Sequence, residues 1–403
     1  MDGILTLRIA IVVHGRFHAF DLARALLRRG HEVVLFTNYP AWAVVRFDLP
    51  RECVRSFWFH GFLSRVFARL PLWMKTPWLE ESLYRLFGSW AAAQLRKGSW
   101  DLVNCWSGAS EELLRDPQLD AKVKLLVRGS SHMRTQEAIA IGERKRTGFP
   151  VELPAPWMIA REEREYGLAP WIRVPSRFAR DSFIQQGVPA SKVVTIPSSV
   201  PLETFRSRPG VVEERVLRIR SGEPLRVLYA GSLSFRKGLW DLQQILEGLE
   251  ASRFSVRVVG SVAPEAVPFL AERALRAEKI PHQPQEKLPE LYAWADLFLF
   301  PTLEDGYPQT LAQAYASGLV ALATNRCSAP DFIRDGETGW VLPPADPKVF
   351  LERLRWCDAH REETAAMVQR IQKQPLRDWD KAAQELETFA AQAAQGTHVR
   401  FSG

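Results

Sequence analysis

An acidic turn followed by a helix start gives this chain its clearest chemical signal. An apolar strand predicted at 297–300 leads into a turn at 304–306, and a helix is predicted to begin near Pro308. Proline suits the first turn of a helix because its missing N–H would be unpaired there anyway. The free amides that follow point out of the positive end of the helix dipole. The segment therefore predicts a cradle for a phosphate or diphosphate, formed by the amides of Gln309, Thr310 and Leu311.

Two polar side chains flank this cradle. Asp305 precedes it, and Gln313 lies one helical face later, with seven residues between the two. A carboxylate accepts hydrogen bonds from hydroxyl groups, and a side-chain amide both donates and accepts them. The pair is therefore suited to binding a ligand that carries hydroxyl groups. A strand–turn–helix of ordinary α/β architecture, without chemistry, is the alternative interpretation.

A basic turn lies upstream of the acidic one. Residues 226–246 predict a strand, a turn that contains Gly231, and a helix opened by Lys237. The cations Arg236 and Lys237 at such a turn would neutralise a diphosphate leaving group. An exposed basic turn without a ligand is the alternative.

Together these segments resemble the retaining glycosyltransferases of family 4, where an E-x7-E segment holds the sugar and diphosphate of a nucleotide-sugar donor. The aligned positions here are Asp305 and Gln313. Glu304 takes the place of the first acid only if the turn shifts by one residue. The family commonly has an arginine where this chain has Ser232, so Arg236 would supply that cation. The resemblance extends over residues 7–347.

The resemblance implies a set of site residues. The donor sugar would contact Asp305, the ribose would contact Gln313, and a turn at 14–18 would line the acceptor side. His132 would face the reaction centre, although a packing histidine is the alternative for that position. The predicted catalytic residues are His132, Lys237 and Asp305. The predicted donor-binding residues are Gly231, Ser232, Arg236, Lys237, Gly306, Tyr307, Gln309, Thr310 and Gln313, and the predicted acceptor-side residues are Gly15, Arg16 and His18.

The elements that must position these residues follow an α/β pattern. Residues 7–37 predict a strand, a turn, an amphipathic helix that ends near Gly30, and a second strand. No GxGxxG dinucleotide motif is present. The resemblance implies the GT-B architecture, in which two doubly wound Rossmann-like domains face each other across a cleft. The predicted parts are an acceptor-binding domain at 1–196, an irregular interdomain linker at 197–224, a nucleotide-sugar-binding domain at 225–375, and a C-terminal helix and tail at 376–403, with the helix packed back toward the first domain.

Composition agrees with two globular domains. The chain has 403 residues, of which 46% are apolar and 25% charged. Its four cysteines are scattered, with no CxxC pair, which favours a reducing compartment. No apolar run reaches the roughly 18 residues that span a bilayer. Asp378 and Asp380 form a D-x-D pattern before a predicted helix, where helix capping explains them better than a metal, so no metal site is predicted.

The basic charge is concentrated in the first half. Residues 1–200 have a net charge of +9, and the remainder a net charge of −2. Residues 51–100 contain 8 basic, 3 acidic and 11 aromatic residues. A basic helix with an aromatic face at 55–97 would suit the headgroup region of an anionic membrane. Packing of these aromatics against a sheet is the alternative, and nucleic-acid binding is disfavoured because no motif with a defined groove geometry is present.

These observations predict a retaining, metal-independent hexosyltransferase that uses a nucleoside-diphosphate sugar as co-substrate and no cofactor. The expected acceptor is a lipid-linked molecule or a glycan, and the expected location is the cytoplasm or the inner face of the cell membrane. Two alternatives remain. One is a protein of the same fold that binds sugar nucleotides or glycans without transfer, and the other is a sugar-nucleotide epimerase.

Overall fold

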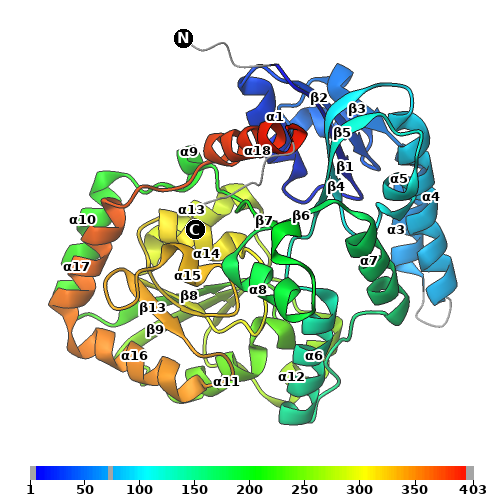
Figure 1. Cartoon of the computed structure of the whole chain (residues 1–403). Coiled ribbons are helices and arrows are strands. Elements are labelled where there is room, and N and C mark those ends of the chain that lie inside the picture. The colour runs from blue at the N-terminus through cyan, green and yellow to red at the C-terminus, as the bar shows by residue number, and fades with distance from the viewer. Residues whose placement is uncertain (1–5, 71–75, 396–403) are drawn as a thin grey trace.

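The structure is a computed structural model that describes residues 6–70 and 76–395. Each half of the chain forms one parallel β-sheet with helices on both faces (Figure 1). The loops after the carboxyl ends of the two sheets meet between the halves, where Ser131 of the first half donates to Glu304 of the second. Two doubly wound parallel sheets were expected from the sequence, and this prediction is confirmed.

The first sheet has seven strands in the order β3-β2-β1-β4-β5-β6-β7. The strand order reverses between β1 and β4, and ligands of open α/β sheets bind outside the strand ends at such a reversal. The strands are β1 (Arg8–Val13), β2 (Glu32–Thr37), β3 (Val54–Ser56), β4 (Trp100–Trp106), β5 (Ala121–Val127), β6 (Trp171–Val174) and β7 (Val193–Thr195). The helices between them are α1 (Ala19–Arg28), α2 (Ala41–Val44), α3 (Trp58–Arg69), α4 (Pro77–Leu95), α5 (Glu111–Arg115), α6 (Met133–Thr147), α7 (Pro156–Leu168) and α8 (Arg177–Gln185).

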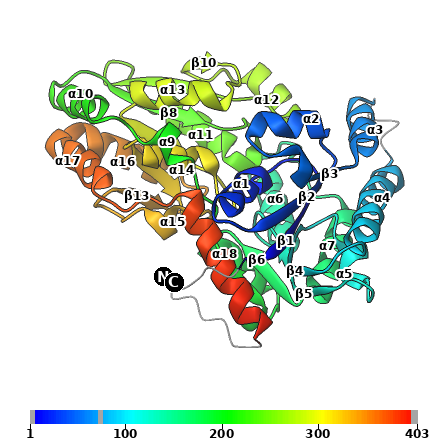
Figure 2. The ribbon, with the colours of Figure 1, turned by 90° about the horizontal axis from the view of Figure 1, so that it is seen from above.

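The strands of this sheet are apolar on both faces because helices cover both sides. On one side, α1 and the last helix, α18 (Trp379–Ala394), form a core with the sheet. On the other side, buried residues of α4, α5, α7 and α8 form a second core. Figures 1 and 2 show α18 lying beside α1, although the two are far apart in the sequence. Glu387 of α18 contacts His31 there, with 2.6 Å between Oε1 and Nε2.

The second sheet has six parallel strands in the order β10-β9-β8-β11-β12-β13, which reverses between β8 and β11. The strands are β8 (Leu225–Ala230), β9 (Phe254–Val259), β10 (Glu278–Ile280), β11 (Leu297–Phe300), β12 (Val320–Thr324) and β13 (Gly339–Leu342). The helices are α11 (Leu239–Glu247), α12 (Val267–Glu272), α13 (Leu288–Trp294), α14 (Gln309–Ala316), α15 (Ala329–Phe332), α16 (Pro347–Ala359) and α17 (Arg361–Gln372). The acidic and basic turns of the sequence follow the two strands that flank this reversal.

Residues 197–224 are more ordered than their composition suggested. The prediction of an irregular segment is wrong, because it contains α9 (Leu202–Phe205) and α10 (Pro209–Arg220). Pro209 occupies the first position of α10, and Val212, Val216 and Ile219 follow at helical spacing and are buried. The helix packs against α17. The polar and proline-rich composition concealed this short apolar stripe.

The basic, aromatic stretch at 55–97 contains both aromatic side chains that pack against the first sheet and aromatic side chains that are exposed. Its residues 71–75 lie outside the described residues. In α4, Phe87, Ala91 and Leu95 are buried against the first sheet. In α3, Trp58 and Phe62 remain 60% and 56% exposed. None of the described helices is long and apolar enough to cross a membrane.

Candidate active site

A glycine in the acidic turn lies directly against the backbone of the first half. A Cβ atom built on Gly306 would lie 2.2 Å from the carbonyl oxygen of Gly129, which follows β5 in the first half. Any side chain at this position would therefore force the halves apart. Gly306 was predicted to bind the donor. The structure shows a separate reason for a glycine here, which is the close approach of the Gly129 backbone.

The carboxylate of Glu304 joins the two halves. It is fully buried, and it accepts hydrogen bonds from the Ser131 amide at 3.1 Å and the Ser131 hydroxyl at 2.8 Å. It also accepts from the Ser130 hydroxyl and, at 3.0 Å, from the side-chain amide of Gln136 in α6. On its own half, Arg236 donates to the same carboxylate at 3.0 Å. We call these five residues the Glu304 cluster.

The cluster favours the ionised form of Glu304. Burial by itself raises the pKa of this carboxyl group, but Arg236, Lys237 and the hydroxyls of Ser130 and Ser131 together lower it by more, and the pKa falls to about 2. The carboxylate is therefore charged at neutral pH. A buried charge is stable only when its partners stay in place, so the cluster links the charge of Glu304 to the contact between the halves.

Asp305 faces a different partner. Its carboxylate pairs with the ammonium group of Lys237, which lies at the end of the basic turn after β8. Burial lowers the pKa of Lys237, and Asp305 opposes that shift. Gly238 follows with a φ of +76°, and a Cβ there would lie 1.9 Å from the carbonyl oxygen of Pro301. Only glycine fits this position, and it brings the basic turn directly against the start of the acidic loop.

The amino end of α14 is open, as the sequence predicted. Pro308 is the residue before the helix and provides no side-chain cap, and Ala312 is the first residue of the helix whose amide donates to a carbonyl of this turn. In the side chain of Gln309, the Nε2 atom is buried and has no partner among the described residues. Unpaired buried donors next to a helix start suit an anion or an oxygen-rich ligand.

Gln313 is less accessible than the sequence suggested. Its side chain is buried, and its Oε1 atom accepts a hydrogen bond from the Tyr292 hydroxyl at 3.0 Å. That hydroxyl also lies 3.3 Å from the carbonyl oxygen of Thr310. The acceptor atom of the Gln313 amide is therefore occupied within the second half, and contact with a ribose would use its N–H groups.

His132 has the surroundings of a packing histidine. Its ring contacts Tyr166 and Phe183, with centroids 4.9 and 5.0 Å away, and its Nδ1 atom accepts from the Arg134 amide at 3.1 Å. It thereby caps α6. Burial lowers its pKa to about 4, so the ring is neutral at pH 7. These contacts are the ones expected of the packing alternative, and the catalytic role of His132 stays a prediction.

The predicted acceptor-side turn follows β1. Gly15 has a φ of +106°, and its amide donates to Asn38 at 2.9 Å. The guanidinium group of Arg16 lies 3.9 Å from the centre of the Phe47 ring, which holds the cation against the first half. His18 contacts Trp379 of α18, and burial lowers its pKa, partly offset by Asp21 and Asp305. Of these three residues, His18 therefore lies within electrostatic range of the acidic turn.

The remaining predicted donor residues lie around the same two loops. The Gly231 amide donates to Val259, and the Tyr229 hydroxyl donates to the carbonyl oxygen of Ser232 at 2.9 Å. Tyr307 lines a small hollow between the halves together with His18 and other residues. The contacts of these residues are all with other parts of the protein.

The described residues contain no group of three or more potential metal ligands that could hold an ion. Asp378 caps α18 by accepting from the Lys381 amide at 2.8 Å, and Asp380 pairs with Arg28 at 3.0 Å. The interpretation of the D-x-D pattern as a helix cap is confirmed.

Sequence reasoning missed the contribution of the first half. Ser130, Ser131 and Gln136 donate hydrogen bonds to Glu304 of the other half. In the sequence, the polar character of the turn after β5 is the one feature that indicates a contact there. A polar turn at the carboxyl end of a parallel strand is the usual place for ligand-facing residues. The polar turn therefore indicated where contacts would be made, but not that Glu304 of the second half would be the partner.

Comparison with known proteins identifies the family. Residues 16–204 match the model of Glycosyltransferase Family 4, and residues 224–357 match the model of Glycosyl transferases group 1. The chain belongs to glycosyltransferase family 4. The family predicted from the acidic and basic turns is therefore confirmed.

Two sequence relatives show how far the likeness extends. The chain is 25% identical to the lipopolysaccharide 1,2-N-acetylglucosaminetransferase of Salmonella typhimurium over 234 residues, which are 54% of this chain and 60% of that protein. It is 28% identical to the alpha-galactosylglucosyldiacylglycerol synthase of Streptococcus pneumoniae over 222 residues, which are 51% of this chain and 53% of that protein. The matches thus span only about half to three fifths of these relatives.

Solved structures show the same fold over nearly the whole chain. Anabaena Alr3699/HepE, in complex with UDP, has a TM-score of 0.66 at 13% identity, with 96% of this chain and 100% of that chain covered. WaaG, a glycosyltransferase involved in lipopolysaccharide biosynthesis, has a TM-score of 0.63 at 17% identity, with 95% and 99% covered. The family 4 chain therefore has the GT-B fold, as predicted.

Proposed function

We propose that this family 4 protein transfers a hexose, with retention, from a nucleoside-diphosphate sugar to a lipid-linked or glycan acceptor. The observation that carries the proposal is the position of the Lys237–Asp305 pair. It lies after β8 and β11, the two strands at the reversal of the second sheet, and directly precedes the open end of α14. A cation, an acid and free amides thus occupy the place where doubly wound sheets bind ligands.

Each group has a distinct role in this proposal. The Lys237 ammonium group has three donors, so one can remain on Asp305 while others contact the diphosphate. The amides at the start of α14 would bind the same phosphates, and Asp305 would accept from a sugar hydroxyl. Charge grows on the leaving diphosphate as the glycosidic bond breaks, and groups fixed in advance stabilise that charge best.

Retention follows from transfer on one face of the sugar. In this proposal the sugar passes through an oxocarbenium-like transition state, and the leaving phosphate takes the proton of the acceptor hydroxyl. The proton moves from the acceptor oxygen to the phosphate oxygen, while the bond from the anomeric carbon changes from the phosphate to the acceptor. The protein supplies orientation and charge stabilisation. Because side chains and a helix end neutralise the diphosphate, the proposed reaction requires no metal.

Arg236 was predicted to bind the diphosphate, and in the structure it also contacts Glu304. It donates to both the carboxylate and the backbone carbonyl of Glu304, at 3.0 and 3.2 Å. With a side chain that is 47% exposed, it keeps free N–H groups for a ligand. We assign Arg236 to donor binding when the Glu304 cluster is formed, so that closure of the halves and binding of the diphosphate support each other.

The acceptor side of the proposal is supported by surface chemistry. The face of α3 places Trp58, Phe62, Arg65 and Arg69 at helical spacing, and all four are exposed. Apolar rings with adjacent cations suit the interface of an anionic membrane. The two sequence relatives described above are named for lipopolysaccharide and diacylglycerol products. We therefore propose a peripheral contact with an anionic membrane through α3 and the adjoining α4.

One observation favours a second candidate function. The Oε1 atom of Gln313 is occupied by Tyr292, and Glu is replaced at both positions of the family's motif. A protein that binds sugar nucleotides without transfer would tolerate these changes, and a sugar-nucleotide epimerase would act without an acceptor.

The test is an assay of purified protein with a panel of nucleoside-diphosphate hexoses, with and without lipid extract, and in the presence and absence of EDTA. Our proposal expects release of the nucleoside diphosphate with a new glycosylated lipid or glycan, unchanged by EDTA. Donor binding without turnover would support the binding protein, and isomerised donor without acceptor would support the epimerase. Strict dependence on magnesium or manganese would reject the metal-independent mechanism.

A further inference from the structure

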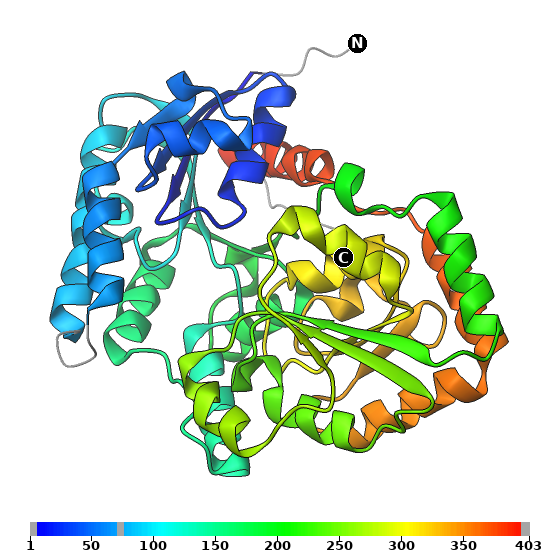
Figure 3. The ribbon, with the colours of Figure 1, turned by 180° about the vertical axis from the view of Figure 1, so that it is seen from behind.

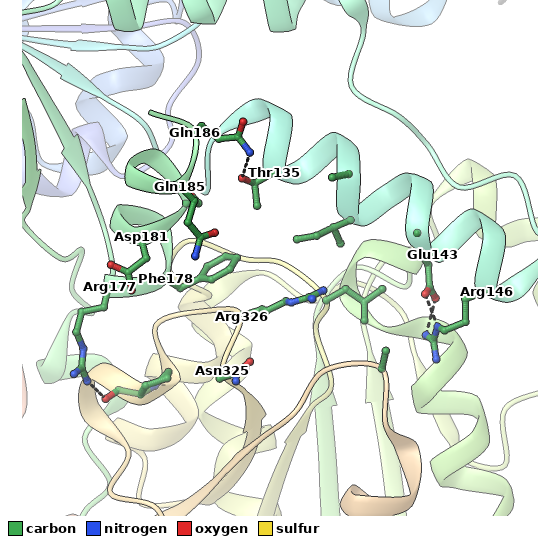
Figure 4. Close-up of a pocket in the computed structure, with 17 residues that line it drawn as sticks. Thr135, Glu143, Arg146, Arg177, Phe178, Asp181, Gln185, Gln186, Asn325 and Arg326 are labelled. Atoms are coloured by element: carbon green, nitrogen blue, oxygen red, sulfur yellow. Dashed lines mark hydrogen bonds and ion pairs between the residues drawn. The ribbon is translucent and has the colours of Figure 1, made fainter. Parts of the chain in front are cut away.

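A cavity of about 860 Å³ lies between helices α6 and α8 of the first half and the loops after β11, β12 and β13 of the second (Figure 4). Its volume is in the range of sites for small organic ligands. None of the predicted donor or acceptor-side residues lines it. It is therefore distinct from the site described above and has no assigned occupant.

One cation in this cavity has no partner. Arg326 follows β12, and its backbone carbonyl accepts from the Asp305 amide at 3.0 Å. Figure 4 shows its guanidinium group directed into the cavity. Among the described residues, its side chain has no hydrogen bond or ion pair, and burial lowers its pKa with no carboxylate to oppose the shift.

The other two arginines of the cavity differ from Arg326 in this respect. Arg146 donates to Glu143 and, at 2.7 Å, to Asp241, and Arg177 pairs with Asp331 at 2.6 Å. Their charges are neutralised by the protein itself, and both bridge the two halves. A partly desolvated guanidinium group without a counter-charge is costly, so Arg326 is the position where an anionic ligand would gain most.

The lining also contains two carboxylates, Glu143, which pairs with Arg146, and Asp181, which lies 3.7 Å from Arg180. The uncharged part of the lining suits a polar ligand with a carbon skeleton. Thr135, Ala138 and Gly142 follow one another at helical spacing along α6. The last two leave the space open, because alanine has only a methyl group and glycine has no side chain. Gln185 of α8 and Asn325 add amide groups, and Figure 4 shows the Gln185 side chain pointing into the cavity. The volume far exceeds what an inorganic anion would fill.

We propose that this cavity binds a small phosphorylated sugar or polyol, with Arg326 contacting its phosphate group. The guanidinium group offers paired N–H donors that match phosphate oxygens. The amides of Gln185 and Asn325 and the hydroxyl of Thr135 would contact the hydroxyl groups of the ligand.

Binding at this cavity would affect the relation between the halves. Its walls come from both halves, so a ligand there interacts fully only when they are together. A ligand that favours one arrangement shifts the population toward it. The amide of Asp305 also donates to the backbone carbonyl of Arg326 within the second half, so a ligand held by Arg326 would contact the segment that supports the acidic turn. The ligand is thus expected to tighten donor binding, and by linkage the donor to tighten binding of the ligand.

The binding test uses three probes: glucose 6-phosphate, glycerol 3-phosphate and inorganic phosphate. Thermal unfolding of the full chain is titrated with each probe, and with glucose and sodium chloride at matched ionic strength. We expect the two phosphorylated organic probes to raise the unfolding temperature and the glucose and chloride controls to have no effect. Equal stabilisation by glucose would overturn the role of the phosphate, and equal stabilisation by inorganic phosphate would overturn the role of the carbon skeleton.

Two variants connect this binding to the cavity. Arg326→Gln should weaken the apparent affinity about tenfold or more, since a charge-assisted contact is lost. The matched control is Arg206→Gln, an exposed arginine outside the cavity, which should bind as the wild type does. Gly142→Phe should place a ring in the cavity, since a Cβ at this position meets no atom within 4 Å, and should abolish binding.

Wild-type affinity in both cavity variants would overturn the proposal, as would the absence of stabilisation of the wild type by any probe. This proposal does not depend on the chemistry at Lys237 and Asp305. A donor-binding measurement on Arg326→Gln separates the two, because the variant retains every group assigned to the donor.

Discussion

Glu304 and Asp305 are adjacent in the sequence, yet their carboxylates serve different regions of the molecule. Glu304 is buried between the halves and accepts from Ser131 and Gln136 of the first half. Asp305 pairs with Lys237 inside the second half. One carboxylate therefore supports the contact between the halves, and the other belongs to the site proposed for the donor. In a turn, a change of one residue is enough to separate a positioning role from a chemical one.

The largest expected effect tests the chemical side of this comparison. Lys237→Ala should lower turnover about a hundredfold or more, because the charge of the leaving diphosphate would lose its stabilising cation. Donor affinity should fall by less, since the interaction is strongest in the transition state. Steady-state kinetics with the identified donor measures both. Lys287→Ala, an exposed lysine of the same half, is the control, and a Lys237 variant with wild-type turnover would remove this residue from the mechanism.

The adjacent carboxylates can then be distinguished directly. Asp305→Ala should lose most activity, on the order of a hundredfold. Gln313→Glu should be tolerated, because one carboxylate oxygen can still accept from Tyr292 while the other accepts from a ribose hydroxyl in place of the lost N–H contact. Kinetics of both variants with donor and acceptor is the measurement. If Asp305→Ala were neutral and Glu304→Ala inactive while still folded, the two roles would have to be exchanged.

Glu304→Gln tests the positioning side through stability. The pKa of Glu304 falls from 4.5 to about 2 in the folded protein, so ionisation of this group stabilises the fold above pH 4.5 and that contribution disappears as pH falls toward 2. The shift corresponds to on the order of 3 kcal/mol at neutral pH. Denaturant unfolding from pH 7 downward should show a destabilised variant whose difference from wild type shrinks below pH 4.5.

The control for this prediction is Glu290→Gln, because Glu290 is 75% exposed. It should follow the wild type at every pH. A constant difference between Glu304→Gln and wild type across the whole range would show that the loss comes from packing and not from the charge.

The smallest effect concerns the outer surface of the first half. The double variant Arg65→Glu/Arg69→Glu should bind anionic vesicles about thirtyfold more weakly, since each basic residue near such a surface contributes about 1 kcal/mol. Binding of the wild type should also weaken as salt rises. Co-sedimentation with anionic and neutral vesicles is the measurement, and Arg206→Glu/Arg208→Glu in the second half is the matched control. Failure of the wild type to bind either vesicle would show that the exposed rings of α3 serve another purpose.

The local elements of the second half could be predicted from the sequence for a physical reason. Strand β11 has the bounds predicted for it, and α14 begins one residue after Pro308. A buried strand, a proline at a helix start and the free amides behind it depend on the local backbone alone, so their sequence carries the signal. The basic and acidic turns could be located in advance, whereas the pairing of Lys237 with Asp305 became visible only when the structure placed β8 next to β11.

Figure 3 shows the two halves from behind, with separate sheets that meet through their loops. The sequence by itself determined two α/β halves, a helix start next to Pro308 and a helix cap in the D-x-D pattern. Only the tertiary structure decided that Glu304 meets Ser130 and Ser131 and that His132 packs between aromatic rings. It also decided that the three arginines of the cavity between the halves differ in their partners. Those outcomes depend on how two separately folded sheets dock, and no local periodicity records the geometry of that contact.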